Sequence, residues 1–278
     1  MNETYSAWLT TEQAAALAGV SVSTLKRWAD QGLVECSKTA GRHRRFSRKA
    51  VAAVLSRNAG TTEHDALCAR WLAELTGGNA LAIDAALLDM RAEHTSWAEA
   101  ADAFAPVLHY IGLLWERGEI SVLQEHVLSE RIARTWSRAA STVVVPAHAP
   151  RMLLSTACRD EHTLGLSLAE IALREAGWAP VWSGRSTPVS DIVAQLQTAM
   201  VRGVALSASS ICDDPDALAR ELAAIVAGST SPDTRVLLGG NGAWPALLPP
   251  GVARVHSFVE LAAAARPPVG RVIPYAGL

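Results

Sequence analysis

The periodicity of hydrophobic and polar positions changes along the chain and separates segments of different type. Between residues 62 and 142, apolar side chains recur every three or four residues, as in Leu67, Trp71 and Leu75. This spacing places the apolar side chains on one face of a helix. Four such segments with short loops predict a four-helix bundle. The predicted helices cover residues 63–76, 79–93, 96–117 and 119–140.

From residue 150 onward, short apolar runs alternate with segments of helical period. Five strands alternating with helices predict a Rossmann-like, doubly wound parallel sheet. The predicted strands cover residues 152–156, 180–183, 203–207, 235–238 and 254–256. Ligands of such sheets bind beyond the carboxyl ends of the strands, so the loops at those ends are the candidate sites.

The N-terminal segment has a third pattern. Thr10 and Gln13 form a capping box that opens one helix, and Ser21 caps a second helix after a short turn. Two short helices joined by a turn are typical of a helix-turn-helix. Residues 33–46 predict a basic β-wing, and residues 48–57 predict a third helix.

Charge separates this head from the rest of the chain. The 278 residues carry a formal net charge of −2. Residues 1–58 hold nine basic and four acidic side chains, whereas the other 220 residues have a net charge of −7. A basic head on an acidic body is typical of a DNA-binding domain joined to a sensing domain. Boundary-like segments at 58–62 and 146–150 then predict three domains, which are residues 1–58, 62–142 and 150–278.

Composition excludes other classes of protein. Half of the residues are apolar and 19% are charged, which excludes a disordered chain. No apolar run reaches the roughly 18–20 residues of a membrane helix, and the N-terminus has no signal-peptide pattern, so we expect no membrane. Four cysteines without metal or disulfide spacing favour a reducing cytoplasm. The lack of a dinucleotide fingerprint and of a P-loop disfavours those two cofactor classes.

The loop after the first strand of the sheet carries a candidate metal ligand. His162 lies at its tip, two residues after Asp160, and Gly165 follows where a bulky ligand could approach the backbone. A carboxylate behind an imidazole fixes its tautomer and raises its basicity. The same pattern also suits an ordinary solvent-exposed histidine.

Two further strand ends offer space. The third strand ends at Ser207 and is followed by Ser209, whose small hydroxyl groups leave room and form hydrogen bonds. The fourth strand ends in Gly239 and Gly240, which leave space against a bulky ligand.

The end of the predicted bundle carries another constellation. Trp115 precedes a turn, and Glu125 and His126 follow about two helical turns into the next helix. All three could therefore face the same end of the bundle. On this pattern alone, a tryptophan at a helix end is usually core and a Glu-His pair is usually on the surface.

The basic head resembles the winged helix-turn-helix of the MerR family and of excisionases. The resemblance implies that the second helix enters the major groove and that the wing contacts the backbone or minor groove of operator DNA. A solvated basic face is the alternative. The DNA-contacting residues implied are Ser23, Thr24, Lys26, Arg27, Arg42, His43, Arg44 and Arg45.

The strand-end loops resemble the DxHxxG, SxL and GG signature of cobalamin-binding domains, with Ser209 in place of the leucine. In that family the nucleotide tail of the corrinoid leaves cobalt and threads into the sheet domain. The resemblance implies that His162 is the lower axial ligand of cobalt and that Asp160 supports it. It also implies that Gly165, Ser207, Ser209, Gly239 and Gly240 bind the cofactor.

The order of the three parts resembles CarH/LitR-type light-responsive transcriptional regulators, over essentially the full chain. Their Wx9EH motif matches Trp115, Glu125 and His126. The resemblance implies a repressor rather than an enzyme, with adenosylcobalamin as cofactor and Trp115 against the adenosyl group. Glu125 and His126 would hold that group or the adjacent protomer. The implied assembly is a homo-oligomer, a tetramer in the dark, that binds operator DNA and releases it in light.

One departure from this family leaves alternatives open. Well-known members have a histidine directly after the tryptophan, whereas this chain has Glu116, so His109, His126 or water would be the upper ligand after illumination. A cobalamin-level sensor without light response is therefore an alternative. A photoreceptor with another tetrapyrrole and a corrinoid methyl carrier are others, and the basic head argues against the carrier.

Overall fold

The computed structural model describes residues 8–18, 34–38, 41, 43–198, 201–229, 231 and 233–266, together with Val22, residues 25–26 and Ala29. Of residues 16, 38 and 52–63 it describes only the backbone. The chain divides into two compact units, Met1–Arg70 and Trp71–Leu278.

The N-terminal unit contains a small antiparallel sheet packed on a helix. Strands β1 (Trp8–Leu9), β3 (Arg44–Ser47) and β2 (Cys36–Lys38) pair in the order β1-β3-β2. Helix α1 (Thr11–Ala18) begins with the expected capping box, because Thr10 and Gln13 bond each other's backbone N–H groups at 3.0 and 3.2 Å. Phe46 is fully buried among apolar side chains and belongs to the core of this unit.

The predicted break at residues 58–62 is wrong, because α3 runs continuously from Arg48 to Gly77. Ser47 caps its start by accepting a hydrogen bond from the Ala50 backbone N–H at 3.4 Å. Gly60 and its threonine neighbours each cost a helix about 1 kcal/mol or less, which does not stop a helix with favourable sequence on both sides. The extent of the three functional domains stays a prediction.

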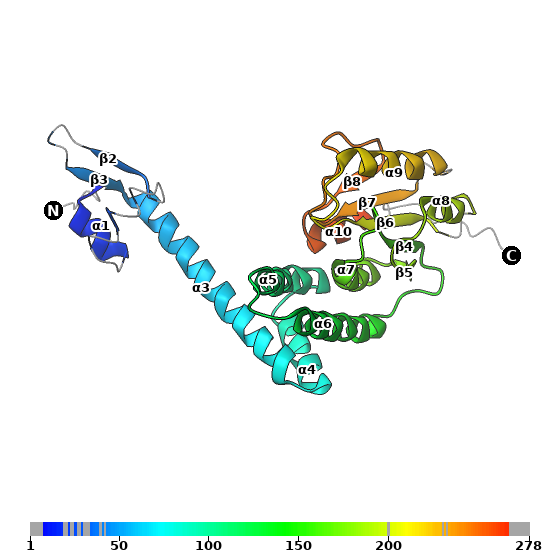
Figure 1. The fold of residues 1–278 in the computed structure, drawn as a ribbon, viewed down its shortest axis with the longest axis horizontal. Helices are drawn as coiled ribbons and strands as arrows, with labels where there is room; N and C mark the ends of the chain where they lie inside the picture. Colours follow the sequence, from blue (N-terminus) through cyan, green and yellow to red (C-terminus); the bar gives the residue numbers. More distant parts are fainter. Residues whose placement is uncertain are drawn as a thin grey trace. The chain divides into compact units, whose positions relative to one another are not determined.

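The predicted four-helix bundle is confirmed, and the C-terminal part of α3 is its first helix. Helices α4 (Ala80–Ala92), α5 (Trp97–Glu116) and α6 (Val122–Thr142) follow the C-terminal part of α3 (Figure 1). Their core is aromatic, with Phe104 edge-on to Trp71 at 4.8 Å and to Trp136 at 5.4 Å between ring centroids. Arg131 of α6 donates to the Leu75 carbonyl at the end of α3 at 2.6 Å, which satisfies a helix terminus.

The predicted α/β unit is confirmed as a five-stranded parallel sheet in the order β5-β4-β6-β7-β8. The strands are β4 (Arg151–Thr156), β5 (Ala179–Trp182), β6 (Gly203–Ser207), β7 (Arg235–Gly239) and β8 (Val252–Arg254). The helices are α7 (Leu164–Glu175), α8 (Val189–Gln197), α9 (Pro215–Gly228) and α10 (Phe258–Ala265).

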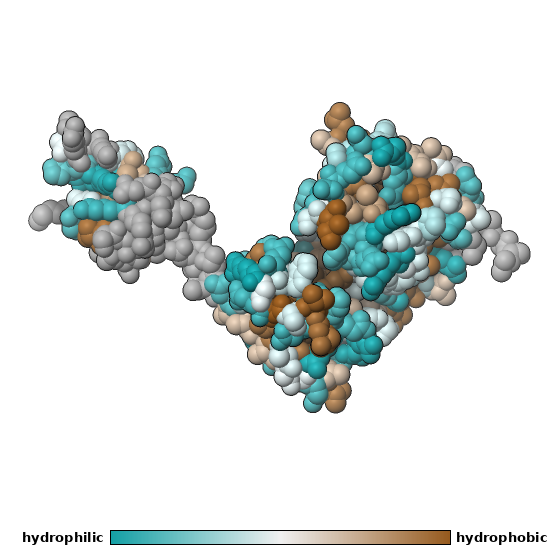
Figure 2. Space-filling model, in the orientation of Figure 1, coloured by the Kyte–Doolittle hydropathy of each residue, from teal (hydrophilic) through white to brown (hydrophobic). Residues whose placement is uncertain are grey.

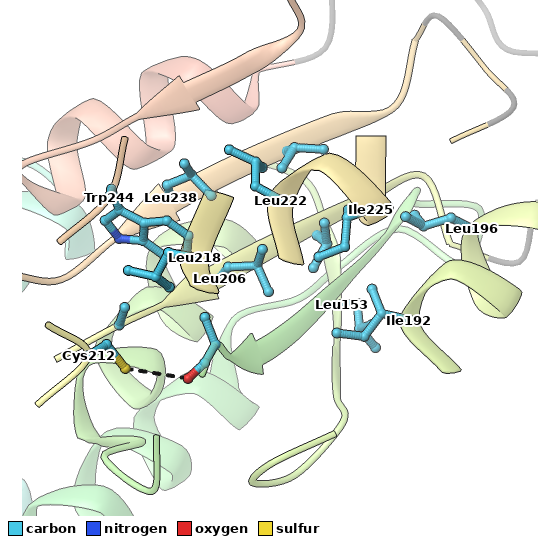
Figure 3. Packing of buried hydrophobic residues seen from close by; sticks show 14 of the residues in the cluster. Leu153, Ile192, Leu196, Leu206, Cys212, Leu218, Leu222, Ile225, Leu238 and Trp244 are labelled. Atoms are coloured by element: carbon cyan, nitrogen blue, oxygen red, sulfur yellow. Dashed lines mark hydrogen bonds between the residues drawn. The ribbon is translucent and has the colours of Figure 1, made fainter. Parts of the chain in front are cut away.

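The helices cover both faces of the sheet. Leu154 and Leu237 pack with α7 and α10 on one face, whereas Leu206 and Leu238 pack with α8 and α9 on the other. Figure 3 shows the second of these cores, with Leu218 and Leu222 of α9 directed at the strands. The carboxyl ends of all five strands therefore meet at one edge.

The bundle is attached to the α/β unit by carboxylates that cap backbone N–H groups. Asp102 of α5 accepts hydrogen bonds from the Phe258 and Val259 N–H groups at 2.6 and 3.0 Å, at the start of α10. Glu175 of α7 accepts a bond from the Trp97 N–H at 2.8 Å, at the start of α5. These bonds fix the bundle beside α7 and α10. Within the described part of the chain, no helix is both long and apolar enough to cross a membrane.

Candidate functional site

The centre of the candidate site is the loop between β4 and α7. Asp160 is only 4% exposed, and its carboxylate accepts hydrogen bonds from the backbone N–H of His162 at 3.0 Å and of Ser209 at 2.5 Å. Burial opposes its ionisation, but these bonds and that of the His162 side chain hold the Asp160 pKa below its usual value. Asp160 is therefore a buried anion that ties two strand-end loops together.

His162 is the side chain that this carboxylate orients. Its Nδ1 lies 2.7 Å from the Asp160 Oδ1, while the side chain is 60% exposed. With Nδ1–H directed at the carboxylate, the neutral ring presents its Nε2 lone pair outward, as metal-binding histidines do. Among the described residues, no three His, Cys, Asp or Glu side chains are grouped to hold a metal ion. His162 could therefore act as a single protein ligand to a metal whose other ligands come from a bound cofactor.

Three small residues lie beside this loop, at the start of α7 and at the ends of β6 and β7. Ser207 and Gly239 are paired in register and follow Leu206 and Leu238, which face the other way. Residues of a strand alternate between faces, so Ser207 and Gly239 lie on the face covered by α7 and α10. A Cβ on Gly239 would meet nothing within 4 Å, and one on Gly165 would come no closer than 4.0 Å to the Ser207 Oγ. Gly165, Ser207 and Gly239 therefore leave space together.

Gly240 and Ser209 have different positions from these three. Gly240 has a φ of +79°, and a Cβ there would lie 2.2 Å from the Ala208 carbonyl oxygen, so Gly240 permits the close approach of two loops. The hydroxyl of Ser209 lies 3.4 Å from the His162 Nδ1. Ser209 therefore belongs to the Asp160–His162 group, which its backbone N–H also joins.

The bundle residues of the expected site lie at the ends of α5 and α6. Trp115 is 48% exposed, although a tryptophan there would usually be core. Glu125 is half-buried and accepts a hydrogen bond from the Ser129 hydroxyl at 2.5 Å. His126 is exposed, and its Nε2 lies 3.7 Å from the Glu125 Oε2. In the part of the chain that the structure describes, no hydrogen bond or ring contact joins Trp115 to this pair.

Apolar surface surrounds these bundle residues. Val122, Leu123 and Val127 of α6 are all exposed. Figure 2 shows brown, hydrophobic surface in the region of α5 and α6. An open depression of about 350 Å³ is lined by His126, Val127, Glu130, Arg131 and Arg134. This end of the bundle is therefore an unusual surface for a protein that stays alone in water.

The expected DNA-contacting residues are described only in part. Ser23, Thr24, Arg27 and Arg42 lie outside the described residues. Lys26 and His43 are exposed, and Arg45 is half-buried. The Arg44 guanidinium donates to the Lys26 carbonyl oxygen at 3.0 Å, so the wing strand is linked to the segment that carries Lys26.

Three side chains outside the strand-end motifs hold the backbone of the strand-end loops, and the sequence did not predict them. The Trp244 indole N–H donates to the Gly239 carbonyl at 2.9 Å, and Arg254 donates to the Gly240 carbonyl at 3.2 Å. Glu221 of α9 accepts a bond from the Cys158 N–H at 2.9 Å. Glu221 and Arg254 lie 63 and 14 residues along the chain from the backbone groups that they contact, so no local motif indicated them. Trp244 is only five residues after Gly239, but it belongs to none of the strand-end motifs.

Comparison with known proteins adds two family models. A model described as a helix-turn-helix domain matches residues 8–59, and one described as a B12 binding domain matches residues 67–135. A search of curated proteins finds no significant match.

Solved structures support the fold. The monomethylamine corrinoid protein of Methanosarcina barkeri is 13% identical with a TM-score of 0.52, over 70% of this chain and 95% of that chain. This likeness indicates a shared fold. A cobalamin-binding protein from Desulfitobacterium hafniense DCB-2 is 18% identical over 63% of this chain and 83% of that chain, with a TM-score of only 0.33.

The chain thus combines a helix-turn-helix head with a B12 binding domain, and it has a corrinoid-protein fold. The predicted fold class is confirmed. This combination fits a cobalamin-binding helix-turn-helix regulator of the CarH type.

Proposed function

We propose that this protein is a light-responsive transcriptional repressor that binds adenosylcobalamin and acts as a homotetramer on operator DNA in the cytoplasm. The observation that carries the proposal is the Asp160–His162 pair, on a chain that also has a helix-turn-helix domain. The pair offers an oriented imidazole nitrogen at the sheet edge where parallel sheets bind ligands.

The residues present fit a corrinoid. His162 Nε2 would serve as the lower ligand of cobalt, and Asp160 keeps the ring in the required tautomer. Gly165, Ser207 and Gly239 leave the space that a nucleotide tail needs. Bound adenosylcobalamin would supply a cobalt–carbon bond that light can break.

The bundle end would report the state of the cofactor. Trp115, Glu125 and His126 are polar or aromatic groups on the surface near exposed Val122 and Leu123, so they are available to a ligand or to a second protomer. A change at this surface would alter assembly. Because a small head binds DNA weakly alone, loss of assembly would release the operator.

Two alternative functions are each supported by one specific observation. Glu116 stands where well-known light-responsive relatives have histidine, which favours a cobalamin-level sensor without light response. The shared fold with a monomethylamine corrinoid protein favours a methyl carrier. The helix-turn-helix domain at residues 8–59 argues against the carrier, which has no need of DNA.

The proposal is tested by size-exclusion chromatography and absorption spectra of protein loaded with adenosylcobalamin, before and after green light. We expect a larger species in the dark and a smaller one after illumination, with a changed spectrum. Protein loaded with cyanocobalamin, which lacks the adenosyl group, is the control. An unchanged size after complete photolysis would contradict the light switch and leave the sensor alternative.

A second variant pair tests the cofactor site. His162→Ala should lose most of the affinity for hydroxocobalamin, whereas His256→Ala, at an exposed histidine of the same unit, should not. Undiminished affinity and an unchanged spectrum in His162→Ala would contradict the ligand role.

A further inference from the structure

The loop that presents His162 begins with an unfavourable backbone turn. Cys158 and Arg159 have φ values of 57° and 58°, in the left-handed region where residues with a Cβ are disfavoured. Such a conformation persists only where surrounding contacts hold it. Asp160 follows this turn directly and His162 two residues later, so the contacts that hold the turn also position this pair.

Contacts within the loop hold one side of the turn. The Asp160 N–H donates to the Ala157 carbonyl at 2.9 Å, and the Ala157 N–H donates to the Ser207 carbonyl at 2.9 Å. The Cys212 thiol also lies 3.6 Å from the Ala157 carbonyl, as the dashed line in Figure 3 marks. These bonds hold Ala157 and Asp160, but they do not reach the Cys158 N–H.

The Cys158 N–H is held from α9. The Glu221 Oε2 accepts its hydrogen bond at 2.9 Å. Glu221 is half-buried, and burial holds the pKa of its carboxyl group above the usual value although the Cys158 bond lowers it. Nearby Leu218 and Leu222 are buried against the sheet, which makes α9 a fixed support (Figure 3).

We propose that Glu221 is a positioning residue for the cofactor site: by holding the Cys158 N–H, it sets the left-handed turn that presents Asp160 and His162. The inference rests on the proposed corrinoid site and extends it to a helix outside the strand-end motifs. Without the acceptor, the turn relaxes toward ordinary φ values, and the Asp160–His162 pair loses its fixed direction.

The test compares Glu221→Ala, Glu221→Met and Glu221→Gln with wild type in full-length protein. Alanine and methionine remove the acceptor, and methionine keeps much of the volume. Glutamine keeps an oxygen that can accept the N–H. Arg220→Ala is the matched control, because Arg220 is exposed on the same helix.

The first measurement is the affinity for hydroxocobalamin by absorbance titration. We expect the alanine and methionine variants to bind about tenfold more weakly, as for other residues that orient a metal ligand. The glutamine variant and Arg220→Ala should stay close to wild type. Using two acceptor-free variants means that poor folding of one leaves the test intact.

The second measurement reports His162 directly. In protein labelled with ¹⁵N-histidine and loaded with cob(II)alamin, an axial histidine splits the electron paramagnetic resonance lines into doublets, whereas the corrinoid's own ¹⁴N base gives triplets. Wild type, Glu221→Gln and Arg220→Ala should give doublets. Glu221→Ala and Glu221→Met should lose doublet intensity, which a merely structural role in α9 would not cause.

The outcomes separate the two proposals. Wild-type affinity and full doublets in both acceptor-free variants would overturn the role of Glu221 while leaving the corrinoid site intact. If wild type itself gave no doublet, the proposed site and this inference would both fall.

Discussion

The Asp160 carboxylate lies 2.7 Å from the His162 Nδ1 and at the same time accepts the Ser209 N–H. One buried anion therefore orients the candidate ligand and locks the loop after β4 to the loop after β6. The direction of the imidazole is set before any cofactor arrives.

Asp160→Asn should lower the affinity for hydroxocobalamin about 10- to 100-fold, because the amide keeps the shape but loses the charge that makes the imidazole basic. Absorbance titration measures the effect. Asp213→Asn, at an exposed position of the same unit, should bind as wild type does. Equal affinities of the two variants would contradict the role of Asp160.

Asp102→Ala should loosen the bundle from α10, because it leaves the Phe258 and Val259 N–H groups without their acceptor. Loss of a helix cap costs about 1 kcal/mol, which lowers the melting temperature of a unit of this size by about 2–4 °C. Calorimetry of the protein without cofactor measures this shift. Asp89→Ala on the exposed side of α4 should leave it unchanged.

Phe104→Ala should destabilise the bundle by about 3–5 kcal/mol, because the ring contacts both Trp71 and Trp136 and its removal leaves a cavity. Urea unfolding followed by tryptophan fluorescence measures the loss. Leu88→Ala, at an exposed leucine of α4, should change the free energy of unfolding by less than about 0.5 kcal/mol.

Lys26→Ala should weaken binding to duplex DNA of any sequence and reduce the salt slope of log affinity by about 1, as expected when one phosphate contact is lost. Fluorescence anisotropy at several salt concentrations measures both. Arg117→Ala removes an equal charge from the exposed end of the bundle and should change neither. A slope unaffected by Lys26→Ala would remove Lys26 from the interface.

Glu116→His should change the absorption spectrum of the illuminated, adenosylcobalamin-loaded protein, because an imidazole nitrogen binds cobalt better than a carboxylate or water. The dark spectrum should stay the same. Identical spectra of the illuminated variant and wild type would contradict the view that residue 116 faces the cofactor.

The secondary structure was largely predictable, because burial leaves a periodic trace in the sequence. The strand predicted at residues 203–207 coincides with β6, and the one predicted at 235–238 covers all but the last residue of β7. The continuity of α3 was not predictable, because Gly60 and its threonines read as a loop when only local propensity is considered. The candidate metal ligand could also be predicted from the sequence, because Asp160 and His162 are only two residues apart.

The sequence by itself determined the order of elements, the sign of charge in each part and the His162 loop, because each depends on residues close together in the chain. Only the tertiary structure decided that Ser209 shares the Asp160 carboxylate, that Asp102 caps α10 and that Glu221 holds the Cys158 N–H. These bonds join residues tens of positions apart. No local periodicity records them, since they form only after the sheet and its helices have packed.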